Sequence, residues 1–113
     1  MDSNTNMVNH NFTITKGDSL QFTITIEDTQ VEPSDIIFTV KDESFDGEDV
    51  IHYSLLHGEI NRKQETGYVY SIYIPYYTSE KFKLLNYIYQ IELVFGGDHE
   101  TVAEGKLIVT PEL

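Results

Sequence analysis

The sequence has no cysteine, no tryptophan, only 3 prolines and few basic residues. Without cysteine there are no disulfides or thiolate metal ligands, which fits a reducing compartment. No run of about 18 apolar residues occurs, so no membrane-spanning helix is expected. The 7 Lys and Arg against 19 Asp and Glu give a net charge of −12. Such a chain repels nucleic acid, whose binding depends on neutralised phosphates. The acidity indicates either simple solubility or an acidic face that meets a basic partner.

The first ten residues are polar and lack the basic and apolar regions of a secretion signal. We therefore expect residues 1–10 to be a disordered N-terminal segment and residues 11–113 to form a single domain. Export by a signal peptide is not expected. Asn11-Phe12-Thr13 matches a glycosylation sequon, which has no expected role without export.

Apolar and polar residues alternate along most of the chain, which is typical of strands with one buried face. Ser19–Asp28 and 87–95 show the alternation most clearly, and 12–15, 36–41, 50–56, 68–74 and 100–110 complete the set. About seven short strands at these spacings predict an all-β, antiparallel, Ig-like sandwich. The residues expected in its core are Phe22, Ile24, Phe38, Val40, Ile72, Tyr87, Ile91 and Leu93.

Local signals refine this fold. Gly96-Gly97-Asp98 predicts a tight hairpin turn, and Gly105 predicts a bulge or a close approach of two backbones. Thr78–Leu85 is the one stretch compatible with a helical turn. Tyr87, near the start of the penultimate strand, lies where Ig-like domains carry a tyrosine corner. The Cys–Trp–Cys core of antibody domains is absent, so hydrophobic packing must hold the two sheets together.

The segment KDESFDGEDV, residues 41–50, begins like a calcium-binding loop. Asp42, Ser44, Asp46 and Gly47 match the first half of an EF-hand, but Tyr53 occupies the position of the closing bidentate Glu. The flanks are also predicted strands. We therefore expect an acidic connection between strands, and a weak calcium contact through Asp42, Asp46, Glu48 and Asp49 is the disfavoured alternative.

Other site chemistry is sparse. His52 and His57 differ by an odd number of positions, so on one strand they would point to opposite faces. No metal-ligand spacing, GxSxG elbow, P-loop or GxGxxG motif occurs. Carboxylate pairs are numerous, but catalysis requires a cleft that perturbs their pKa values. We expect no enzymatic activity, no cofactor and no metal.

Seven of the 8 tyrosines lie between Tyr68 and Tyr89. Tyr73 is out of phase with the predicted buried face, and Tyr76 and Tyr77 follow Pro75 in a connection. Exposed tyrosines favour binding because they bring large contact area at low entropy cost. We therefore predict an interaction surface at Tyr73, Tyr76 and Tyr77. The alternative is that the 78–85 connection folds over them.

Several short motifs occur along the chain in a fixed order. They are Lys16-Gly17-Asp18, Phe38-Thr39-Val40-Lys41, Gly67-Tyr68, Ile74-Pro75, Thr78, Tyr87-Ile88-Tyr89-Gln90-Ile91 and Gly105-Lys106-Leu107-Ile108-Val109. In order and spacing, over residues 12–110, the chain resembles small β-sandwich proteins of phages and prophages of Gram-positive bacteria. It departs from that pattern at Asn86, near which a glycine is common, and at Gln90, where Asp is common.

The resemblance implies a structural or accessory virion component of the tail or baseplate region, with no catalytic residues. Its partners would be other virion proteins or further copies of itself, with neither nucleic acid nor membrane. Its location would be the bacterial host cytoplasm during assembly and then the virion. The alternative function is a carbohydrate- or surface-binding Ig-like module of a bacterium, against which the missing export signal and the missing tryptophan count.

Overall fold

The computed structural model describes residues 8–9, 11–26, 32–42, 49–63, 68–83 and 86–111. Nine strands and one short helix lie within them. They are β1 (Val8–Asn9), β2 (Phe12–Thr15), β3 (Leu20–Thr25), β4 (Asp35–Asp42), β5 (Asp49–Ser54), β6 (Ile60–Arg62), β7 (Val69–Ile74), α1 (Tyr76–Ser79), β8 (Asn86–Phe95) and β9 (Asp98–Thr110). The all-β prediction is confirmed. No helix in the described part of the chain is long and apolar enough to cross a bilayer.

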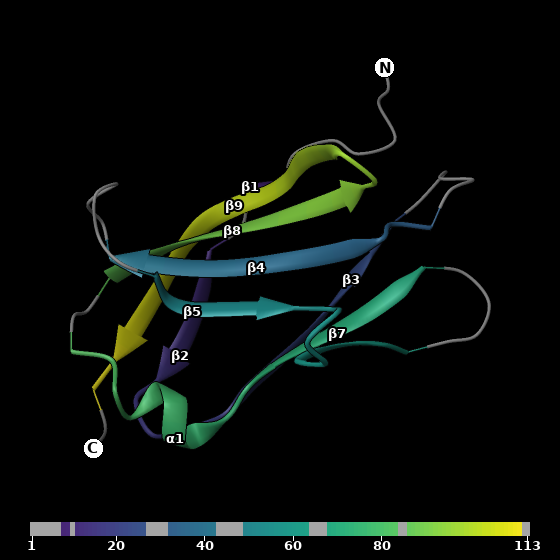
Figure 1. Ribbon diagram of the computed structural model, residues 1–113. Coiled ribbons are helices and arrows are strands. Elements are labelled where there is room, and N and C mark those ends of the chain that lie inside the picture. Colours follow the sequence, from purple (N-terminus) through teal and green to yellow (C-terminus); the bar gives the residue numbers. More distant parts are fainter. Residues whose placement is uncertain are drawn as a thin grey trace.

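The strands form two sheets. In Figure 1, β4, β5, β8 and β9 belong to one layer, and β3 and β7 belong to the other. The larger sheet has the order β1-β9-β8-β4-β5, with β2 also paired to β9, and the smaller has the order β3-β7-β6. Variable-type Ig domains place strands G, F, C and C′ in one sheet and B, E and D in the other. The observed order is the same. The fold is therefore an Ig-like sandwich.

Two features differ from what the sequence predicted, one in strand direction and one at the N-terminal end of the domain. β1 and β2 run parallel to β9, because the chain enters along the same edge and in the same direction as the last strand. Val8 and Asn9, within the segment expected to precede the domain, form β1. The rest of that segment lies outside the described residues.

The core lies between the sheets and follows the predicted alternation. Six of the eight predicted core residues are buried: Phe38, Val40, Ile72, Tyr87, Ile91 and Leu93. Phe22 and Ile24 are only partly buried and pack against the core from one side. The reason is their position, since β3 is an edge strand among the described residues and pairs only with β7.

An aromatic cluster joins the sheets where antibody domains have a disulfide and a tryptophan. Phe22 of the smaller sheet lies 4.5 Å from Phe12 and 5.6 Å from Phe38, measured between ring centroids. Tyr89 lies 5.1 Å from Phe12 and 6.0 Å from Phe38. Offset and edge-on ring pairs at these distances stabilise a core beyond the area they bury. Packing of rings thus links the two layers here.

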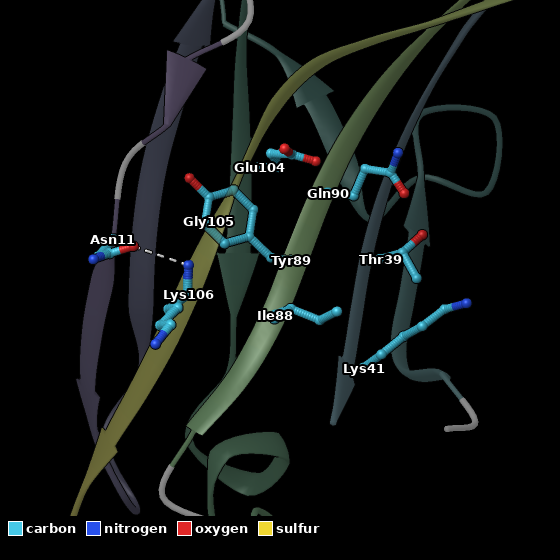
Figure 2. A pocket seen from close by; sticks show the side chains of 9 residues that line it. All are labelled: Asn11, Thr39, Lys41, Ile88, Tyr89, Gln90, Glu104, Gly105 and Lys106. Atoms are coloured by element: carbon cyan, nitrogen blue, oxygen red, sulfur yellow. Dashed lines mark hydrogen bonds between the residues drawn. The ribbon is translucent and has the colours of Figure 1, made fainter. Parts of the chain in front are cut away.

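The hairpin turn predicted at Gly96-Gly97 is confirmed, and the bulge predicted at Gly105 is not observed. Gly96-Gly97 makes a two-residue hairpin between β8 and β9, and Gly96 has the positive φ of 63° that favours glycine. The register shift lies between Ile91 and Glu92, opposite Val102, and Gly105 pairs regularly with Tyr89. Of the two alternatives expected for Gly105, the bulge is therefore wrong. Figure 2 draws Gly105 beside the ring of Tyr89, its partner on β8.

Tyr87 fulfils the tyrosine-corner expectation. It is 3% exposed, and its hydroxyl accepts a hydrogen bond from the backbone N–H of Lys83 at 2.9 Å. The Phe82 ring packs on the Tyr87 ring with centroids 4.8 Å apart. These contacts hold Phe82 and Lys83, which follow α1, against the sandwich.

Candidate functional site

The tyrosine surface, defined as Tyr73, Tyr76 and Tyr77, lies on the outside of the molecule. Tyr73 is 47% exposed, Tyr76 56% and Tyr77 58%, whereas Tyr87 and Tyr89 are each 3% exposed. Tyr73 points outward from β7, as its strand phase predicts. Tyr76 and Tyr77 open α1, at the end of β7 (Figure 1). A role in binding stays a prediction.

α1 begins at Tyr76 and ends at Ser79, at the start of the predicted 78–85 turn. Pro75 explains this start. Its φ of −73° suits the first turn of a helix, and its carbonyl accepts the N–H groups of Thr78 and Ser79 at 3.0 and 3.2 Å. The expected turn began at Thr78, and threonine is a favoured N-cap residue. In the structure, Pro75 is the N-cap and Thr78 lies within the helix.

Ser79 anchors the helix to the body of the protein. Its side chain is fully buried, and Oγ accepts a hydrogen bond from Gly17 N–H at 3.0 Å and donates one to the Asp18 carbonyl at 2.6 Å. Gly17 lies in the turn between β2 and β3 and has a φ of 90°. The helix is therefore tied to two strands distant from it in sequence, which holds Tyr76 and Tyr77 in a fixed orientation.

The rings of Tyr76 and Tyr77 lie edge to face, with centroids 5.6 Å apart and an interplanar angle of 86°. Beside them, burial raises the pKa of the half-buried Tyr53 above its ordinary value, and a hydrogen bond with the Thr78 side chain opposes this rise. The described part of the 78–85 connection leaves the tyrosine surface open to solvent. Leu84 and Leu85 lie outside the described residues.

A second candidate is a groove of about 470 Å³ on the outer face of the larger sheet. Figure 2 shows the side chains that line it. Register places Lys41 of β4 and Lys106 of β9 on either side of Ile88 of β8. The next row holds Thr39, Gln90 and Glu104. At the rim, Asn11 Oδ1 accepts the backbone N–H of Lys106 at 3.0 Å (Figure 2).

The groove offers hydrogen-bond donors and two cations in a strongly acidic chain. Lys41 Nζ lies 3.6 Å from an Asp49 carboxylate oxygen, so part of its charge is already neutralised. Gln90 donates to the Thr101 hydroxyl at 2.8 Å. Sequence reasoning missed this groove. The alternation of the sequence does place the Lys41 and Lys106 side chains on the outer face. It does not give the register between β4, β8 and β9 that brings the two lysines to either side of Ile88.

The acidic 42–49 loop is described only at its ends. Asp49 has its carboxylate oxygens 3.6 Å from Lys41 Nζ and 3.4 Å from His52 Nδ1. Asp46 and Glu48 lie outside the described residues, so the calcium hypothesis stays untested. His52 is on β5 and His57 in the turn that follows, and they do not share a strand. Within the described ranges, no three potential metal ligands group together.

The fold and the strand order define the class of protein as an Ig-like domain. No protein-family model matches the chain. No curated protein matches it either. A solved structure that is similar is the Ig-like domain of mouse leukocyte-associated immunoglobulin-like receptor 1, in a strand-swapped dimer. Its TM-score is 0.56 at 13% identity, over 89% of this chain and 88% of that one. A likeness at this identity establishes the fold alone.

Proposed function

We propose that this chain is a non-enzymatic binding module that acts through protein–protein contacts, and that it serves in the assembly of a phage or prophage particle at the tail or baseplate. The observation that carries the binding role is the tyrosine surface on an anchored helix. Three tyrosines are exposed, and two of them lie on a helix that Ser79 ties to the body of the protein, so those two rings are held in place before a partner binds. The phage context rests on the order of sequence motifs.

A protein partner suits this surface better than a sugar. Sugar rings stack on flat aromatic faces, and the 86° angle between Tyr76 and Tyr77 leaves them no common plane. Perpendicular rings fit a pocketed protein surface, where tyrosine is an enriched contact residue. Partners would be other virion proteins or a second copy. The structural neighbour forms a dimer of its own by strand swapping.

The test combines gene context with binding. Products of the flanking genes are co-produced with the full chain, and complexes are measured by gel filtration and calorimetry. The Tyr73→Ser, Tyr76→Ser variant should lose the complex while its unfolding free energy changes by less than about 1 kcal/mol. The control is Leu56→Ser, a 73% exposed apolar side chain outside the tyrosine surface, which should bind normally.

Two results would overturn the proposal. Strong destabilisation of the double variant with an unchanged complex would show that these tyrosines serve the fold. Binding of a glycan that the same variant abolishes, with no protein complex, would favour the carbohydrate-binding alternative. Flanking genes unrelated to tail or portal proteins would remove the phage context without touching the binding role.

A further inference from the structure

Among the strands that the structure describes, β3 pairs along only one of its two backbone edges. Ile26 lies opposite Tyr68 and donates its N–H to the Tyr68 carbonyl at 2.9 Å. In an antiparallel pair, residues two apart turn the same way, so the even-numbered residues of β3 bond to β7. Gln21, Thr23 and Thr25 consequently direct their N–H and C=O groups away from β7. Within the described part of the chain, no backbone partner meets them.

The core is also open along this edge. Leu20, Phe22 and Ile24 point inward but stay partly exposed. Their partners on β7, which are Ile74, Ile72 and Tyr70, are fully buried. Burial therefore falls off from β7 to β3, and a further strand beside β3 would cover the remaining apolar surface.

The same edge carries no charge. The stretch from Ser19 to Ile26 has no charged residue, in a chain whose net charge is −12. The neighbouring outward residues Tyr73, Ser71 and Val69 on β7 and Asn61 on β6 are uncharged as well. Edge strands usually carry a charge, a proline or a bulge that prevents pairing. β3 has none of these, whereas the β5 edge carries Asp49 and His52.

We propose that β3 pairs antiparallel with β3 of a second copy of this chain, around a two-fold axis at Thr23. Thr23 then faces the same residue of the partner, and Gln21 faces the partner subunit's Thr25. These are the residues whose backbone groups are unpaired, so each such pair exchanges two hydrogen bonds. On the inner side Phe22 meets the partner subunit's Ile24. The two three-stranded sheets become one continuous sheet.

A second copy fits this edge better than a foreign strand for two reasons. The row Gln21, Thr23, Thr25 is self-complementary about its middle residue, as a two-fold interface requires. Two chains of net charge −12 repel each other at most surfaces, and the uncharged β3 edge is where that repulsion is weakest. The inference goes beyond the proposed function, because the hydrogen bonds come from the backbone edge of β3 and not from the tyrosine side chains.

The absence of native cysteine permits a direct test by single-cysteine variants of the full chain. In the proposed register, the two Thr23→Cys positions have Cα atoms about 5.5 Å apart, within disulfide range. Gln21→Cys faces the partner's residue 25, so each of Gln21→Cys and Thr25→Cys places its own two cysteines about 14 Å apart. The control is Thr13→Cys, an exposed threonine on β2 of the other sheet.

The variants are equilibrated in a glutathione redox buffer and analysed by non-reducing electrophoresis and mass spectrometry. We expect Thr23→Cys to form a disulfide dimer at least tenfold more than Thr13→Cys. We also expect Gln21→Cys mixed with Thr25→Cys to form the mixed dimer, while neither forms a dimer alone. Adding Tyr76→Ser and Tyr77→Ser, both on α1, should leave the crosslink unchanged, so failure of the proposed function and failure of this pairing are distinguishable.

Sedimentation of chains without added cysteine provides the second readout. The unmodified chain should sediment as a dimer that higher salt strengthens, because salt screens repulsion between the copies. Thr23→Lys should sediment as a monomer, and Thr13→Lys as a dimer. Equal crosslinking of all four single-cysteine variants would mean random collision and would overturn the pairing. A chain that stays monomeric at millimolar concentration would also overturn the pairing. So would hydrogen exchange in which a different protein, and not a second copy, protects the β3 amides.

Discussion

Tyr70 is fully buried, and its hydroxyl has no hydrogen-bond partner among the described residues. It lies on β7 between Ile24 of β3 and Arg62 of β6. A buried polar group without a partner loses its hydration and gains nothing in return, a penalty of about 1–3 kcal/mol. The Tyr70 ring therefore stabilises the fold by packing in the core, whereas its hydroxyl group destabilises the fold.

Removing that hydroxyl should therefore stabilise the fold. We expect Tyr70→Phe to raise the free energy of unfolding by about 1 kcal/mol, measured by urea denaturation. The matched control is Tyr87→Phe, which removes a hydroxyl bonded to the Lys83 N–H and should lower stability by about 1 kcal/mol. A clear loss on Tyr70→Phe would show that the hydroxyl has a partner in the folded protein.

The free energy of unfolding should also change with pH in the alkaline range, because a buried and a half-buried tyrosine lose their protons there. Burial raises the pKa of both Tyr53 and Tyr70 above the ordinary value of 10.0. The folded state then holds these protons more tightly than the unfolded state. Their contribution is complete below pH 10 and disappears as the pH rises through the folded-state pKa values.

The unfolding free energy should thus fall above pH 10, and phenolate absorbance should rise together with unfolding. Tyr70→Phe should make this fall shallower. A profile that Tyr70→Phe leaves equally steep would rule out Tyr70 as a source of the pH dependence.

At the scale of elements, α1 shows how a short helix is held by a few bonds. Its four residues carry no side-chain cap, and Ser79 supplies the links to the Gly17 N–H and the Asp18 carbonyl. Isolated helices of this length are unstable in water. The tyrosine surface depends on tertiary anchoring for its shape.

Ser79→Ala should release this anchor. We expect a loss of about 1–3 kcal/mol in unfolding free energy, since the part-buried N–H of Gly17 and carbonyl of Asp18 lose the Ser79 hydroxyl and a cavity replaces it. Binding of the partner proposed above should weaken as well. Ser34→Ala is the control, because Ser34 also bonds two backbone groups, the Val94 carbonyl and the Gly96 N–H, but is exposed. A folded Ser79→Ala variant that binds at full strength would show that the helix keeps its place without Ser79.

Strand positions were predictable from this sequence because burial on one face imposes a period of two. Ile36, Phe38 and Val40 lie as that period requires. The helix start was missed because the expected turn began at Thr78, whereas the Pro75 carbonyl accepts the first helical hydrogen bonds. The groove between Lys41 and Lys106 depends on register between strands far apart in sequence. Single-strand patterns carry no information on such register.

At the scale of the whole molecule, the sandwich is closed at its centre and open on the β3 side. Ile91 on β8 is 1% exposed and faces the other sheet from the middle of its own. Ile24 on β3 occupies the same kind of inward position but is only partly buried, because no described strand covers its outer flank. The free energy gained from burial is therefore distributed unevenly across the two layers.

Truncation of the two isoleucines should reveal this asymmetry. Ile91→Ala should lower stability by about 2–5 kcal/mol, since it leaves a cavity that the central strands cannot close. Ile24→Ala should lower it by less than about 2 kcal/mol in dilute protein, because solvent already reaches that side chain. If β3 pairs with a second copy, the loss at Ile24 should grow with protein concentration while the loss at Ile91 stays constant. Urea denaturation of both variants at low and high concentration measures this. Equal losses at every concentration would mean that the β3 side is as closed as the centre.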